Sequence, residues 1–334
     1  MSLTLERKTL APAIIGAGIC LVLHRAGILS LFYLVPLGFL TFRFGSKTAW
    51  TALFFAVLAN LLLSMLILGV QGLPIWHGIT DLVFFTVMAV IFIWILSPPP
   101  SLLFNLGGSL RMILGSSMGA LFFVFLYLRL MTSQAFLDQI TSITGVLISL
   151  QSSGGADVVE NALIESINIE FIIETMKSIM LRGGALITCI LIFFGSRQAG
   201  LVIARLSRRE RGTPVFIRFR VLPVFIWVLS VSLLLLVLTK VAGLETPEII
   251  LWNVLILCVM MYLAQGFGIL QFLLARPSIS PFFRLLLLAG FFILLFSPVL
   301  NTILFAGIVL LGIAENWVPF RIPKTNGSPS TPEA

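Results

Sequence analysis

Long apolar runs of roughly 20 residues recur along this 334-residue chain and restrict its fold more than any other feature. Only 10% of the residues are charged, whereas about a quarter are charged in a typical soluble domain. The runs are continuously apolar, unlike the strands of a membrane barrel, in which polar and apolar residues alternate. The sequence therefore predicts an all-α, polytopic helical membrane protein with little room for a soluble domain.

Residues 205–220 contain six arginines and only one acid, Glu210. This positive charge sets the predicted orientation of the chain in the membrane. Short loops rich in Arg and Lys stay on the cytoplasmic side of a membrane. With this loop inside, the N-terminus is also expected to be cytoplasmic. The predicted spans number about eight and lie near residues 11–23, 28–42, 48–70, 79–96, 112–130, 184–204, 221–241 and 249–274.

These spans define four predicted regions. Residues 1–130 form an N-terminal five-helix membrane region, and residues 183–322 form a C-terminal membrane region. Between them, residues 131–182 carry a helical apolar stripe and six acids, which predicts an acidic amphipathic helical hairpin on the extracytoplasmic side. Residues 323–334 are rich in Pro, Ser, Thr and Gly and are predicted to form a disordered tail.

The last apolar run, residues 285–314, is too long for one untilted span, at about 45 Å of straight helix. Pro298 interrupts it near the middle. We expect a hairpin of two half-helices, because that arrangement returns Arg321 and Lys324 to the cytoplasmic side. A single kinked span is the alternative.

Asp81 is the one carboxylate that the sequence places clearly inside a span, and His77 precedes it by four residues, on the same helical face. A carboxylate within a membrane segment is by default a candidate functional site. We predict that His77 and Asp81 bind a ligand near the outer side. In the alternative interpretation, Thr80 and Asp81 only cap the outer end of the fourth helix.

Other polar residues occur within the predicted spans. Asn60 and Gln265 are expected to form hydrogen bonds between helices, and Gln265, which is followed by Gly266, is a further candidate ligand-binding residue. The first span carries the small residues Ala13, Gly16 and Ala17, a pattern that permits close approach of another helix. This face predicts either docking of a partner subunit or packing within the chain.

The chain lacks the residues that several kinds of protein function require. The chain has two histidines and no nucleotide-binding, hydrolase or metal-protease motif, so no enzyme activity, cofactor or metal is predicted. The net charge of +8 lies mainly in loops predicted to face anionic membrane lipid, so it does not indicate nucleic-acid binding. The cysteines Cys20, Cys189 and Cys258 all lie in apolar runs and are expected to be buried.

Across residues 10–321 the chain resembles the YybS-like family of bacterial polytopic membrane proteins, which is distantly similar to the substrate-binding S components of energy-coupling-factor transporters. The residues that carry the resemblance are 35–37, 43–47, Pro214, Phe216, Arg220, Pro223, Gln265, Gly266, Pro281, Arg284, Pro298, Leu311, Gly312, Glu315, Asn316, Trp317, Phe320 and Arg321. The resemblance implies a solute-binding subunit that docks on a transmembrane coupling subunit through small residues of its first helix, where Ala13 and Ala17 match.

Two functional hypotheses follow. The first is a solute-binding or transport subunit that depends on a coupling subunit and ATPases for energy. The second is a non-transporting envelope scaffold, related to cell-wall assembly or sporulation, that binds envelope proteins through the predicted hairpin at residues 131–182.

Overall fold

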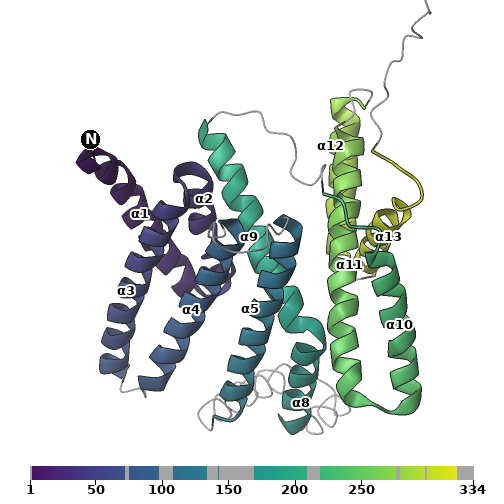
Figure 1. Cartoon of the computed structure of the whole chain (residues 1–334), viewed down its shortest axis with the longest axis horizontal. Helices are drawn as coiled ribbons and strands as arrows, with labels where there is room; N and C mark the ends of the chain where they lie inside the picture. Colours follow the sequence, from purple (N-terminus) through teal and green to yellow (C-terminus); the bar gives the residue numbers. More distant parts are fainter. Residues whose placement is uncertain are drawn as a thin grey trace, which may run out of the picture. The chain divides into compact units, whose positions relative to one another are not determined.

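The computed structural model describes residues 2–71, 75–97, 108–133, 142, 169–208, 219–275, 279–297 and 299–321. Within these ranges the chain is helical, with short turns and no strand, which confirms the predicted all-α class. The chain divides into two compact units, residues 1–211 and 212–334, and each is described below by itself (Figure 1).

The first unit contains the described helices α1 (Ser2–Arg25), η1 (Gly27–Phe32), α2 (Val35–Phe44), α3 (Ser46–Gln71), α4 (Ile75–Leu96), α5 (Gly108–Met131), α8 (Ile169–Ile179), η2 (Met180–Gly184) and α9 (Ala185–Arg208). The second unit contains α10 (Phe225–Ala242), α11 (Glu245–Leu274), α12 (Pro281–Phe296) and α13 (Leu300–Ala314). Most of the predicted hairpin at residues 131–182, the arginines of residues 209–218 and the tail at 323–334 lie outside the described residues.

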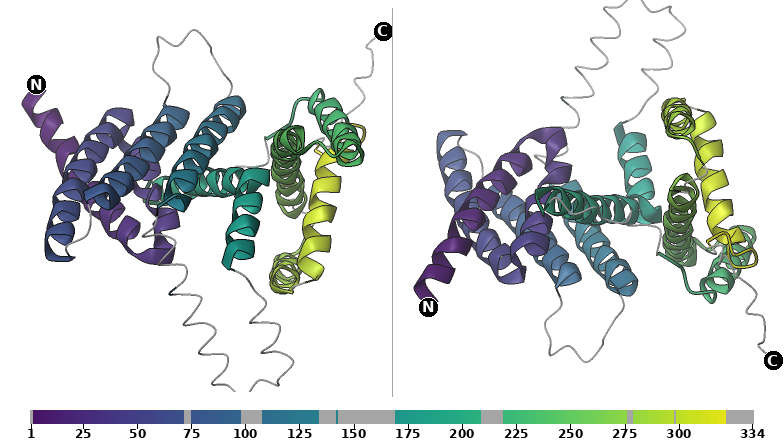
Figure 2. Two further views of the ribbon diagram at one scale, coloured as in Figure 1. Left: turned by 90° about the horizontal axis from the view of Figure 1, so that it is seen from below. Right: turned by 90° about the horizontal axis from the view of Figure 1, so that it is seen from above.

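In the first unit, α3, α4 and α5 lie side by side, α1 packs on α3, and α9 packs across α2 and α5 (Figures 1 and 2). The crossing of α9 and α2 depends on two glycines. A Cβ atom on Gly200 would lie 2.7 Å from the carbonyl carbon of Gly38, so only a residue without a side chain permits this approach. The sequence-based division assigned α9 to the C-terminal membrane region, whereas the structure places it in the first unit.

The second predicted span, residues 28–42, is not one continuous α-helix. Its first part is the short 3₁₀ helix η1, and α2 begins only at Val35, with Pro36 at its amino end. Proline fits the first turn of a helix but interrupts an interior, so its position marks a new helix start. With ten residues, α2 is about 15 Å long, which is too short to cross a bilayer alone.

The helix before the arginine-rich loop is longer than predicted and is kinked. It begins with α8, passes through η2 and continues as α9. The kink lies at Gly183, whose φ of 121° is strained for any residue with a side chain. The predicted boundary at residue 182 therefore coincides with a kink inside a helical stretch.

The second unit is organised around α11, which packs against α10 and α13. Glycines again permit the close contact: a Cβ on Gly266 would lie 2.0 Å from the carbonyl oxygen of Ile308 on α13. The axes of α12 and α13 are bent by 120° at the break after Phe296, so the last apolar run is interrupted where the sequence predicts. The exact hairpin geometry remains a prediction.

Six described helical segments are long and apolar enough to cross a membrane, or seven if the bent pair α12 and α13 forms one span. Thr9–Arg25 and Leu29–Phe44 are shorter apolar segments. The chain is thus a multi-pass membrane protein, and the predicted count of about eight spans is not confirmed.

Candidate functional site

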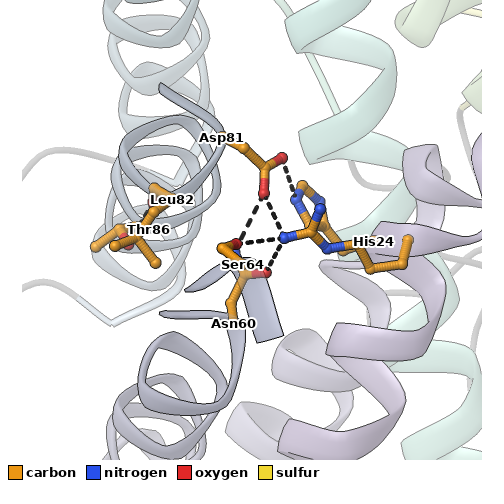
Figure 3. Close-up of polar contacts among 7 residues, drawn as sticks. His24, Asn60, Ser64, Asp81, Leu82 and Thr86 are labelled. Carbon is orange, nitrogen blue, oxygen red and sulfur yellow. Dashed lines mark hydrogen bonds and ion pairs between the residues drawn. The ribbon is translucent and has the colours of Figure 1, made fainter. Parts of the chain in front are cut away.

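Asp81 lies within the first two turns of α4, six residues after the helix begins at Ile75. An N-cap residue precedes the first helical turn. Asp81 therefore does not cap the helix, and the capping interpretation is wrong for this residue. Its carboxylate instead contacts side chains from α1 and α3, as Figure 3 shows.

Two adjacent residues at the end of α1 hold the Asp81 carboxylate. The Nε2 atom of His24 lies 2.9 Å from Oδ1 of Asp81 (Figure 3). The Nη2 atom of Arg25 lies 2.9 Å from Oδ2 of the same carboxylate. The side chains of Arg25 and Asp81 are each 32% exposed, while that of His24 is 7% exposed. The ion pair thus neutralises a carboxylate that an apolar environment would otherwise exclude.

The same Arg25 nitrogen also reaches α3. Nη2 donates to the side-chain oxygen of Asn60 at 2.7 Å and to the hydroxyl oxygen of Ser64 at 2.6 Å. Together with Asp81, three acceptors compete for a nitrogen that carries two hydrogens. The amide of Asn60 also faces the Asp81 carboxylate, at 3.5 Å. Because three acceptors surround a nitrogen that has two hydrogens, one acceptor of the cluster is able to accept a hydrogen bond from a bound molecule.

His24 leaves one ring nitrogen without a partner. Because a carboxylate only accepts hydrogen bonds, Nε2 carries the proton that points to Asp81. The Nδ1 atom is buried and has no hydrogen-bond partner, and the same holds for the hydroxyl of Tyr33. The His24 ring packs edge-on against Tyr33 and Phe85, with centroids 5.2 and 4.8 Å away. Buried polar atoms are normally satisfied, so these two atoms indicate a place for water or a ligand.

The cluster joins the last two residues of α1 and the second turn of α4 to the middle of α3. Asn60 precedes the end of α3 at Gln71 by 11 residues, which corresponds to about 16 Å of helix. Because Arg25 contacts Asn60, the end of α1 lies level with the middle of α3 (Figure 1). A charged cluster among apolar helices that are long enough to cross a membrane is a candidate functional site.

The other predicted ligand-binding residues do not join this cluster in the described part of the chain. His77 lies in the first turn of α4, but its side chain is outside the described residues. Gln265 belongs to the second unit, where it is 2% exposed. Its side-chain oxygen accepts from the Val221 N–H at 2.6 Å, and its amide donates to the carbonyl of Gly312 at 3.0 Å. The expected interhelical hydrogen bonds of Asn60 and Gln265 are confirmed.

The small residues of α1 are used in packing within the chain. Ala13 and Ala17 are 0% and 4% exposed, and a Cβ on Gly16 would lie 2.5 Å from the Cδ1 atom of Leu40 on α2. A partner helix at this face would have to displace a helix of the first unit. Docking of a partner on Ala13, Gly16 and Ala17 therefore stays a prediction, while the structure favours the alternative of internal packing.

Sequence reasoning missed His24 and Arg25 as site residues, because it placed them in an outer turn after a short first span. One signal was available: Asn60 and Ser64 are polar, four residues apart and therefore on one face of an apolar helix. Two polar side chains within an apolar helix need hydrogen-bond partners, and Arg25 donates to both. Within the residues that the structure describes, no group of three His, Cys, Asp or Glu side chains lies close enough to hold a metal ion.

The fold and the cluster define a class: a helical multi-pass membrane protein with an ion-paired polar site between α1, α3 and α4. Comparison of the chain with protein-family models, curated proteins and solved structures gave no match. The resemblance to YybS-like proteins therefore remains an expectation from the sequence.

Proposed function

We propose that the protein is a solute-binding or transport subunit of a bacterial cytoplasmic membrane, with its N-terminus in the cytoplasm. The observation that supports this function best is the cluster around Asp81. An Arg–Asp ion pair with unsatisfied polar atoms beside it is costly inside a membrane protein, and such groups are generally kept for function. A purely structural contact would be served as well by apolar side chains.

The proposed solute is a small polar molecule that carries N–H or O–H groups. Asp81, Asn60 and Ser64 present three acceptors to the Nη2 atom of Arg25, which has two hydrogens to donate. The His24 ring adds a further polar atom at Nδ1, and Tyr33 adds a hydroxyl. A donor-rich solute would satisfy these groups, whereas an apolar solute would leave them unpaired at a cost of about 1–3 kcal/mol each.

The proposed subunit depends on partners for energy, because its sequence contains no nucleotide-binding motif. A transmembrane coupling subunit with ATPases is the partner that the sequence resemblance implies. The test is affinity purification of the tagged full-length protein from native membranes in mild detergent, followed by mass spectrometry. The proposal predicts recovery of a coupling subunit and an ATPase. Recovery of envelope-assembly proteins in their place would favour the scaffold hypothesis.

The same purification separates the solute site from partner docking. Asp81→Asn removes the negative charge of the site. Thr86→Val is its matched control on the same helix, because the Thr86 hydroxyl donates to the Leu82 carbonyl of its own helix (Figure 3). Both variants are expected to recover the same partners as the wild type. Loss of the partners in Asp81→Asn alone would contradict the assignment of Asp81 to a solute site.

A further inference from the structure

The chain that follows α13 folds back on itself and carries an ion pair. Pro319 cannot continue a helix, and residues 315–321 instead form turns, in which the Trp317 N–H donates to a carbonyl in the last turn of α13. This turn brings the side chain of Arg321 back to that of Glu315, six residues earlier. We name residues 315–321 the C-terminal clasp.

Both side chains of this ion pair are almost completely buried. That of Arg321 is 2% exposed and that of Glu315 is 4% exposed. The Nε atom of Arg321 donates to Oε1 of Glu315 at 2.6 Å, and Nη2 donates to Oε2, so the two groups meet through a pair of hydrogen bonds. A buried ion pair adds little net stability compared with apolar side chains of similar size. Its presence is therefore better explained by the contact that it fixes.

That contact is made by the third guanidinium nitrogen of Arg321. Nη1 donates to the backbone carbonyl of Phe219 at 2.9 Å, at the end of the arginine-rich stretch of residues 205–220. Two residues later, the Val221 N–H donates to the side chain of Gln265 on α11 at 2.6 Å. The peptide groups on both sides of Arg220 are thus held by buried side chains of the second unit, while Arg220 itself is exposed.

We propose that the C-terminal clasp holds the carboxyl end of the arginine-rich stretch on the second unit, and that opening of the Glu315–Arg321 pair releases it. Residues 219–222 have no regular secondary structure, so their position depends on these side-chain contacts. A segment of this kind opens at a lower free energy than the helices around it. The clasp therefore sets whether the end of this positively charged stretch is fixed or free. This inference is independent of the proposed solute site at Asp81.

Limited trypsin digestion of the full-length protein in mild detergent tests the clasp. Trypsin cleaves after Arg and Lys, and it requires the backbone around the cut to leave its folded contacts. Mass spectrometry of the fragments gives the rate of cleavage after Arg220 in the wild type and in Arg321→Gln. We expect Arg321→Gln to be cut there about tenfold faster, because loss of a charged hydrogen bond raises the open population by about this factor and cleavage follows that population.

Cleavage elsewhere in the second unit separates release of this segment from general unfolding. Lys240 lies in α10 and Arg284 lies in α12, so cuts after these residues require the helices to unfold. Their rates should be the same in the wild type and in Arg321→Gln.

Trp317→Phe is the matched control. Trp317 belongs to the C-terminal clasp but is 67% exposed, so this variant changes the same segment without removing the ion pair. Its rate of cleavage after Arg220 should equal that of the wild type. If Arg321→Gln does not fold, Arg321→Lys keeps the charge but loses the planar set of donors, and faster cleavage after Arg220 is still expected.

Three results would overturn the proposal. The first is equal cleavage after Arg220 in the wild type and in Arg321→Gln. The second is a parallel rise after Arg220, Lys240 and Arg284, which would show that the ion pair only stabilises the unit as a whole. The third is an equal rise in Trp317→Phe, which would show that the ion pair has no particular role in holding the segment.

Discussion

Arg25 and Asp81 form an ion pair of 2.9 Å that joins the end of α1 to the second turn of α4. The pair lies level with the middle of α3, where Asn60 and Ser64 complete its surroundings. The proposed solute site and the packing of the first three long helices of this unit therefore depend on the same four side chains.

We predict that Arg25 and Asp81 stabilise the protein as a coupled pair. Asp81→Asn or Arg25→Met alone removes a charged hydrogen bond and leaves its partner without compensation, so each should lower the free energy of unfolding by about 1–3 kcal/mol. The double variant should lose less than the sum of the two. Thermal or denaturant unfolding in detergent, with Thr86→Val as control, measures these differences. Strictly additive losses would show that the two residues do not interact.

Gln265 is expected to have a structural role in the second unit. Gln265→Leu would leave the Val221 N–H and the Gly312 carbonyl without their buried partners, which costs about 1–3 kcal/mol each. The unfolding temperature should therefore fall, while the small molecules that co-purify with the protein should not change. A stable Gln265→Leu protein that has lost a bound solute would restore Gln265 as a ligand-binding residue.

The packing of α13 on α11 should depend on Gly312. A Cβ at this position would lie 2.1 Å from the carbonyl oxygen of Tyr262, so Gly312→Ala forces the helices apart and should cost about 1–3 kcal/mol. Gly307 lies on the same helix, and a Cβ there would meet nothing within 4 Å. Gly307→Ala should consequently leave the unfolding temperature close to that of the wild type. Equal effects of both variants would contradict this account of the helix contact.

Single cysteines test the predicted orientation. Glu174→Cys should react with a membrane-impermeant thiol reagent in intact cells, and Arg208→Cys should react only after the cells are opened. The background is expected to be low, because Cys20, Cys189 and Cys258 are all at most 1% exposed. The reverse pattern would invert the predicted topology.

The helical class was predictable from the sequence because membrane helices require continuous apolar runs, and these are read directly from the residues. The break between Phe296 and Leu300 and the burial of the three cysteines were predictable for similarly local reasons. The division of residues 28–42 into η1 and α2 was missed. Its signal was Pro36, but in an apolar run a proline is equally compatible with a kinked membrane helix, so sequence alone does not decide.

The site was predictable only in part. Asp81 was found because a carboxylate in a membrane segment is rare. His24 and Arg25 were missed because their depth depends on how α1 packs against α3, and no local pattern reports that packing. His77 was grouped with Asp81 because helical spacing indicates a shared face. Its side chain lies outside the described residues, so its place in the site stays a prediction.

The central claim is that the Asp81 cluster binds a polar solute, and co-purification tests it most directly. The full-length wild type, Asp81→Asn and Thr86→Val are purified under identical mild conditions, and the small molecules that they release on denaturation are compared by untargeted mass spectrometry. The account predicts one polar, donor-bearing compound that is enriched in the wild type and in Thr86→Val and depleted in Asp81→Asn. Identical profiles for all three proteins, at equal purity and folding, would contradict it.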